Sequence, residues 1–140
     1  MKRIVRILQV EDSPEDRMMM TEALGESSAS IELHSVATTR EATALISSGS
    51  QWQPDLVLLD LSLPGDTGFG VLQFIKCREN LRSLAVIIFS SSKAEKDIQK
   101  AYDLQANCYI PKPADFDGYL ALVASLKDFL TRWVQLPSAK

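Results

Sequence analysis

Two short runs of apolar residues constrain the fold more than any other feature of this sequence. Val57, Leu58 and Leu59 precede Asp60 without a polar interruption, and residues 85–90 read Ala-Val-Ile-Ile-Phe-Ser. A strand with one face in water alternates apolar and polar residues, whereas a strand covered by helices on both faces is apolar throughout. We therefore expect both runs to be strands in the middle of a parallel sheet.

Amphipathic stretches alternate with five strand candidates along the chain. The strands are expected at residues 4–10, 31–35, 56–60, 84–90 and 107–110. The helices are expected to begin at about residues 14, 39 and 93, with two more over 68–78 and 115–133. This alternation is typical of an α/β fold in which a five-stranded parallel sheet is doubly wound, with helices on both faces.

Local signals mark where three of these helices begin. In each case a hydroxyl side chain that can cap a helix is followed three positions later by an acidic residue. The three pairs are Ser13 and Asp16, Thr38 and Glu41, and Ser92 and Glu95. Gly25 and Gly49 stand where the first two helices should end, because glycine readily adopts the left-handed conformation that often follows a last helical turn.

The length and the charge of the chain limit what it can be. Its 140 residues, of which 46% are apolar, suffice for one domain with its own core. A net charge of −3 offers no basic surface for nucleic acid, so we expect no DNA binding. We see no signal peptide and no uncharged apolar stretch of about 18 residues, so we expect no membrane association. Cys77 and Cys108 are far apart, which is typical of reduced thiols in a cytoplasmic protein.

Four of the five expected strands end in charged or hydroxyl side chains. Glu11 and Asp12 follow the first strand, Asp60 ends the third, Ser90 ends the fourth and Lys112 follows the fifth. In an open parallel sheet, ligands bind beyond the carboxyl ends of the strands. We therefore expect these five side chains to meet in one cleft.

Three carboxylates decide the chemistry of this cleft. Two of them about 4 Å apart repel by roughly 4 kcal/mol at an effective dielectric near 20, so the group needs a cation or protons. A site made only of oxygen atoms suits Mg²⁺. Asp60, beside such a cation and Lys112, is placed as a carboxylate nucleophile for a phosphoryl group. Each residue alone could lie in a solvated turn, so the hypothesis depends on their combination.

The segments around these residues resemble the receiver domain of two-component response regulators. The motifs that carry the resemblance are LQVEDSPEDR, PDLVLLDLSLPGDTG, VIIFSSS and YIPKP. The similarity extends over about residues 4–131. It implies a flavodoxin-like fold of the receiver type in a single domain over residues 1–140, with residues 132–140 as a C-terminal extension.

The resemblance also implies a role for each residue of the cleft. Asp60 would be the phosphoacceptor, and Ser90 and Lys112 would contact the phosphoryl oxygens. The implied ligands of Mg²⁺, or of Mn²⁺ in its place, are Glu11, Asp12, Asp60 and the backbone carbonyl oxygen of Ser62.

Two conformational features follow from the same resemblance. Tyr109 matches an aromatic switch that turns inward when Ser90 moves toward the phosphoryl group. The peptide bond between Lys112 and Pro113 is expected to be cis, which is much less unfavourable before proline than elsewhere. The chain departs from the usual pattern of the family over residues 65–70, and it has serine at position 90 where threonine is more common.

Residues 92–113 and the long final helix resemble the stand-alone regulators that accompany bacterial and cyanobacterial phytochrome histidine kinases. We therefore expect a single-domain response regulator that a sensor histidine kinase phosphorylates. Residues 134–140 are too few for an output domain, so the protein would signal by a change of its surface. It would assist its own phosphorylation and dephosphorylation without being an enzyme for another substrate.

Two other classes of protein could share these residues. A phosphorylation-independent interaction module could have the same fold, although the complete set of site residues argues against it. A phosphohydrolase with an aspartyl nucleophile would share the chemistry. Such enzymes usually have an acid/base aspartate two residues after the nucleophile, where this chain has Ser62.

The final helix has more apolar residues than one buried face requires. Its core stripe is expected to consist of Phe116, Leu120, Val123 and Leu130. A second stripe consists of Tyr119, Leu122, Leu126, Phe129 and Trp133. We expect this second stripe to form the interface of a homodimer, and the alternative is a C-terminal tail that folds back over it.

Overall fold

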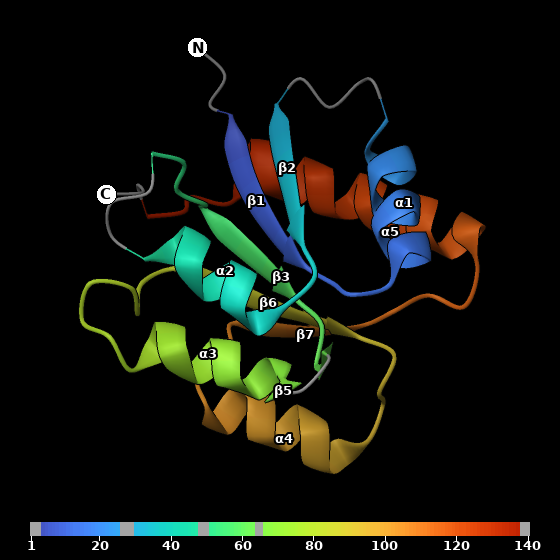
Figure 1. Ribbon diagram of the computed structural model, residues 1–140. Helices are drawn as coiled ribbons and strands as arrows, with labels where there is room; N and C mark the ends of the chain where they lie inside the picture. The colour runs from blue at the N-terminus through green and yellow to red at the C-terminus, as the bar shows by residue number, and fades with distance from the viewer. Residues whose placement is uncertain (1–3, 26–29, 48–50, 64–65, 138–140) are drawn as a thin grey trace.

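The computed structural model describes residues 4–25, 30–47, 51–63 and 66–137, in which strands and helices alternate (Figure 1). The main sheet contains β1 (Val5–Val10), β2 (Ile31–Val36), β3 (Leu56–Leu59), β6 (Ala85–Ser90) and β7 (Cys108–Pro111). The helices are α1 (Pro14–Leu24), α2 (Thr39–Ile46), α3 (Gly68–Lys76), α4 (Glu95–Asp103), α5 (Phe116–Asp128) and the π-helical η1 (Phe129–Trp133). A small antiparallel hairpin, which we did not anticipate, pairs β4 (Ser62–Leu63) with β5 (Asp66–Thr67).

The five strands of the main sheet are all parallel, in the order β2-β1-β3-β6-β7. Strand β3 is central and β6 lies beside it, and every residue of both is buried. The two apolar runs therefore lie in the interior of the sheet, as their composition predicts. The doubly wound α/β fold is confirmed.

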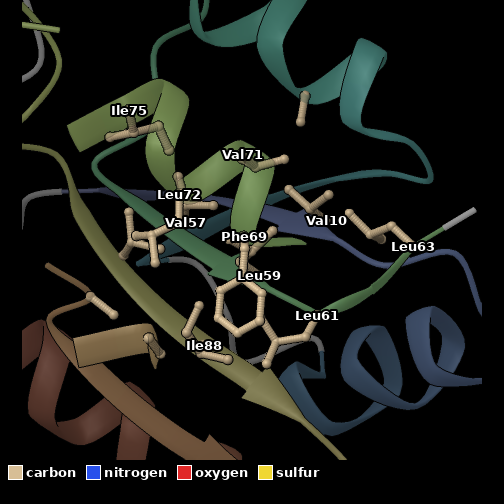
Figure 2. Packing of buried hydrophobic residues seen from close by; sticks show 14 of the residues in the cluster. Val10, Val57, Leu59, Leu61, Leu63, Phe69, Val71, Leu72, Ile75 and Ile88 are labelled. Atoms are coloured by element: carbon tan, nitrogen blue, oxygen red, sulfur yellow. The ribbon is translucent and has the colours of Figure 1, made fainter. Parts of the chain in front are cut away.

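Two apolar layers form because successive side chains of a strand point to opposite faces of the sheet. Helices α2, α3 and α4 cover one face, and α1 and α5 cover the other (Figure 1). On the first face, Phe69 and Leu72 of α3 lie over Val57, Leu59 and Ile88 of the sheet (Figure 2). None of the described helices is long and apolar enough to cross a membrane.

Two of the three predicted helix starts are accurate. The Ser13 hydroxyl accepts a hydrogen bond from the backbone N–H of Asp16, and α1 ends at Gly25, which has a φ of 65°. The Thr38 hydroxyl caps α2 in the same way. The expected stop at Gly49 lies outside the described residues.

Helix α4 begins at Glu95, two residues later than the sequence predicts. The Ser92 hydroxyl donates to a carboxylate oxygen of Asp97 at 2.6 Å and accepts from the N–H of Ala94 at 3.3 Å. Ser92 therefore lies in the loop before α4, which its hydrogen bonds hold in place, and it is not part of the first helical turn.

The buried face of α5 combines residues from both predicted stripes. Tyr119 is 1% exposed and packs edge to face on Phe89, with ring centroids 5.6 Å apart, so its expected place in a dimer interface is wrong. Phe116 and Leu120 are exposed, so their expected place in the core is also wrong. Both stripes have helical spacing, and spacing alone cannot tell which of two apolar faces meets the sheet.

The C-terminal segment folds back against the sheet, as the alternative interpretation of the final helix anticipated. Val134 and Leu136 pack on the core layer beneath α1 and α5. Together with the end of α5 they line a cavity of about 550 Å³ at the amino ends of β6 and β7. The side chains of Phe129 and Trp133 nevertheless stay 50% and 69% exposed.

Tyr119 generates a prediction, because its hydroxyl is buried and makes no hydrogen bond in the described structure. Replacing it with phenylalanine removes an unsatisfied polar group. The free energy of unfolding of Tyr119→Phe should therefore lie within about 1 kcal/mol of the wild-type value at pH 7. Burial, together with the nearby charge of Asp16, raises the pKa of Tyr119 to about 12. An unfolded tyrosine ionises near pH 10, so the wild type should lose stability as the pH rises from about 10 through 12.

The measurement is urea unfolding of both proteins at pH 7 and at pH 11. The variant should lose less stability than the wild type between the two pH values. An equal loss in both proteins would show that Tyr119 is not the group responsible.

Candidate functional site

The site residues stand directly beyond the strand ends because the backbone hydrogen bonds of the sheet continue past them. The N–H of Glu11 donates to the last carbonyl of β2 at 2.9 Å, and the N–H of Asp60 donates to the last carbonyl of β1 at 3.0 Å. The N–H of Lys112 donates to the last residue of β6, Ser90, at 2.8 Å. These bonds fix the backbone of each residue at one edge of the sheet.

The ammonium group of Lys112 lies among three carboxylates. Its Nζ is 2.6 Å from Glu11 Oε1, 2.7 Å from Asp16 Oδ2 and 3.2 Å from Asp60 Oδ2. Burial alone lowers the pKa of this lysine. The hydrogen bonds to Asp16 and Glu11 and the charges of Glu11 and Asp60 outweigh burial and raise the pKa above its usual value. Lys112 is therefore a fixed positive charge at neutral pH.

Glu11 is the most deeply buried carboxylate of the site, with 1% of its surface exposed. The pKa of Glu11 is raised to about 7: burial is the largest cause, the charge of Asp60 acts in the same direction, and the hydrogen bond from Lys112 opposes both. The N–H of Ser13 donates to its second carboxylate oxygen at 3.3 Å, and Arg17 donates to its backbone carbonyl at 2.6 Å. These contacts hold the side chain pointing into the site.

The carboxylates fit a divalent cation. Glu11, Asp12 and Asp60 each offer one oxygen, and these three atoms lie within 4.8 Å of one another. Asp12 is the most open of the three to solvent. The donors are all oxygen atoms, which is the ligand chemistry of Mg²⁺ and Mn²⁺. Ser62 lies next to this group and donates its N–H to Asp60 Oδ1 at 3.3 Å, while the proposed role of its carbonyl stays a prediction.

Residues 7–124 match the response regulator receiver domain. The chain belongs to this family. It is 32% identical over 137 residues to the response regulator Rcp1 of Synechocystis, a match that covers 95% of this chain and 93% of Rcp1. A crystal structure of the phosphorylated cyanobacterial phytochrome response regulator RcpA superposes with a TM-score of 0.89 at 35% identity, covering 96% of this chain and 99% of that one. The crystal structure of the response regulator RPA3017, from red light signalling of R. palustris, superposes with a TM-score of 0.86 at 30% identity, covering 96% of this chain and 99% of that one.

The predicted switch residues of this receiver domain are linked through Ser92. The hydroxyl of Ser90, buried at the end of β6, accepts a hydrogen bond from the N–H of Ser92 at 3.2 Å. The hydroxyl of Tyr109 donates to the carbonyl of Ser92 at 2.8 Å, and its ring packs against the core layer below α3 and α4. Tyr109 is thus turned inward in this structure, and its role as a switch stays a prediction.

The peptide bond between Lys112 and Pro113 is trans, contrary to the expectation from the family resemblance, as is every other bond in the described segments. Proline favours the trans form by about 0.5–1 kcal/mol unless the surrounding structure selects cis. Here the N–H of Lys112 reaches Ser90 and its ammonium reaches three carboxylates with the trans bond in place.

Sequence reasoning missed the role of Asp16. We interpreted it as part of a helix cap, and its backbone N–H does bond to Ser13. Its carboxylate is free to point the other way and contacts Lys112. The available signal was its position in the first turn of α1, four residues after Asp12.

Gly68 is a second position that sequence reasoning did not connect to the site. It begins α3 and donates its N–H to the carbonyl of Leu61 at 2.9 Å. A Cβ atom at this position would overlap the backbone carbonyl oxygen of Asp60. Only glycine lets α3 start this close to Asp60.

We therefore expect Gly68→Ala to displace the backbone of Asp60, lower the free energy of unfolding by about 1–3 kcal/mol and slow phosphorylation. The measurements are urea unfolding and the rate of phosphorylation by acetyl phosphate. Gly70→Ala, in the same helix, is the control, because alanine favours a helix over glycine. If Gly68→Ala and Gly70→Ala had the same stability and the same rate of phosphorylation, the close approach of Gly68 to the Asp60 backbone would be unimportant.

Proposed function

We propose that this receiver domain accepts a phosphoryl group on Asp60 from the phosphohistidine of a sensor histidine kinase. The observation that carries the proposal is the buried carboxylate of Asp60, which ends the central strand beside Lys112 and within reach of the oxygens of Glu11 and Asp12. A carboxylate is a weak nucleophile in water. Phosphoryl transfer to it requires positive charge beside the transferred group, which Lys112 and a cation on these carboxylates would supply.

The transfer balances without a further reactant. A carboxylate oxygen of Asp60 forms a bond to phosphorus as the bond between phosphorus and the imidazole nitrogen breaks, and the nitrogen keeps the electron pair. Lys112 and Ser90 would donate hydrogen bonds to the phosphoryl oxygens. Glu11, Asp12, Asp60 and the carbonyl of Ser62 would hold Mg²⁺ or Mn²⁺, which supplies positive charge to the transferred group.

Relatives support both the cation and the partner. A crystal structure exists of the Mn²⁺-bound form of Rcp1, and RcpA is described as phosphorylated and as a phytochrome response regulator. On this basis we assign the chain a phytochrome-type histidine kinase as its partner, and a role as a stand-alone regulator because the match spans nearly all of Rcp1. A phosphohydrolase is not favoured, because Ser62 cannot serve as the second carboxylic acid.

The signal would pass from Ser90 to the surface through Ser92. Because Ser92 bonds to Ser90, Tyr109 and Asp97, a movement of the Ser90 hydroxyl toward the phosphoryl group would break its bond to Ser92. The loop before α4 would then change position, together with Tyr109 on β7. The surface formed by α4, β7 and α5 is the expected output.

The proposal predicts that Asp60→Asn abolishes phosphorylation. The test incubates the protein with acetyl phosphate and Mg²⁺ and measures intact mass, where one added phosphoryl group is expected in the wild type and none with a chelator. Asp103→Asn, on the exposed side of α4, is the control and should be labelled normally. Labelling of Asp60→Asn at the wild-type level would refute the assignment.

Self-association through the end of α5 is the second part of the proposal. Phe129 and Trp133 are exposed on the same stripe as the half-buried Leu122 and Leu126. Large aromatic side chains dominate protein interfaces, and one helix paired with its own copy makes a twofold contact. The partner we propose for this surface is a second copy of the chain.

Changing both Phe129 and Trp133 to glutamate should therefore convert a dimer into a monomer that still accepts a phosphoryl group. Analytical ultracentrifugation at micromolar concentration measures the change. Phe116→Glu is the control, because this exposed aromatic residue lies outside the stripe. A wild-type protein that sediments as a monomer with and without phosphorylation would remove this part of the proposal.

A further inference from the structure

Asp16 contacts the lysine of the site but does not belong to the group of cation ligands. Its Oδ2 is 2.7 Å from Lys112 Nζ, closer than Asp60 Oδ2 at 3.2 Å. The group that can hold a metal contains Glu11, Asp12 and Asp60. Asp16 is therefore a fourth carboxylate of the site, and binding of the cation does not account for its contact with Lys112.

The ammonium of a lysine has three N–H donors, and in this structure three different carboxylates receive them. Two of the three, Glu11 and Asp60, are also carboxylates that a divalent cation and an incoming phosphoryl group require. Asp16 alone is free to keep Lys112 without competing for them. A buried ammonium that lost all its partners would be strongly unfavourable, so one permanent partner matters.

The carboxylate of Asp16 is well placed for this task. Its backbone N–H is fixed by the cap from Ser13, and its side chain is only 23% exposed. Helix α1, which carries it, packs against α5, which follows Lys112 in the chain. The contact therefore joins two segments that are already held together.

We propose that Asp16 is a positioning residue for phosphoryl transfer: it keeps the Lys112 ammonium at the site while Glu11 and Asp60 bind the cation and the phosphoryl group. This inference rests on the proposed function and adds a residue to it. Without Asp16, the carboxylate partners left to Lys112 are Glu11 and Asp60, which the cation also needs. Lysine and cation would then compete directly.

The test compares Asp16→Asn with Glu15→Gln, which removes the same charge from an exposed neighbour in the same helical turn. Isothermal titration with Mg²⁺ should show roughly tenfold weaker binding for Asp16→Asn, as is typical when a group that orients a metal site is lost. Glu15→Gln should bind Mg²⁺ like the wild type. Phosphorylation by acetyl phosphate at low Mg²⁺ should slow in Asp16→Asn alone and recover at high Mg²⁺.

A second readout observes the lysine itself and separates positioning from a general loss of charge. In a proton–nitrogen NMR spectrum of the lysine ammonium groups, the Lys112 signal is identified by its absence in Lys112→Ala. This signal should shift in Asp16→Asn and not in Glu15→Gln. On addition of Mg²⁺ it should stay protected from water exchange in the wild type and become exchangeable in Asp16→Asn.

The inference and the proposed function can fail separately. If the wild type were never phosphorylated at Asp60, the proposed function would fail, while the changes in Mg²⁺ affinity and in the Lys112 signal would still establish the positioning role. If Asp16→Asn kept both the wild-type affinity for Mg²⁺ and the wild-type Lys112 signal, Asp16 would have no such role, whether or not Asp60 accepts a phosphoryl group.

Discussion

The arrangement of this molecule depends on one buried ammonium group. The side chain of Lys112 is 9% exposed. Its three carboxylate partners lie just after β1, just after β3 and in the first turn of α1. A charge removed from water is costly unless it is paired, so the ammonium group of Lys112 can be buried because carboxylates lie beside it. The same ion pairs tie the ends of β1 and β3 and the start of α1 to the segment after β7. The contacts that form the site therefore also hold these parts of the fold together.

The parallel sheet makes such a concentration of charge possible. Strands β3 and β6 are entirely buried, and they are apolar up to Asp60, which follows β3, and Ser90, which ends β6. The carboxyl edge carries the charged site, while the amino edge carries the apolar cavity and the folded-back C-terminal segment. Chemistry at one edge is thereby separated from the apolar contacts at the other.

The sequence predicts most of this because its strongest signals are local. Uninterrupted apolar runs identify the interior strands, and the rule that strand ends share an edge brings Glu11, Asp60 and Lys112 together. What the sequence does not show is the rotation of a helix about its own axis. That rotation decides that Tyr119 lies inside and Phe116 outside. It also decides that Asp16 meets Lys112, a contact between residues 96 positions apart.

Two hydrogen-bond networks leave the site in opposite directions. One runs from Ser90 through Ser92 to Asp97 on α4, on one face of the sheet, and the other runs from Lys112 to Asp16 on α1, on the other face. They are joined at their origin, because Lys112 donates its backbone N–H to the carbonyl of Ser90. A ligand shifts a conformational equilibrium only by the difference in its contacts with the two states. If a phosphoryl group on Asp60 bonded to both the Ser90 hydroxyl and the Lys112 ammonium, as proposed, it would change the contacts of both networks at once. Both layers of helices would then respond to one phosphorylation.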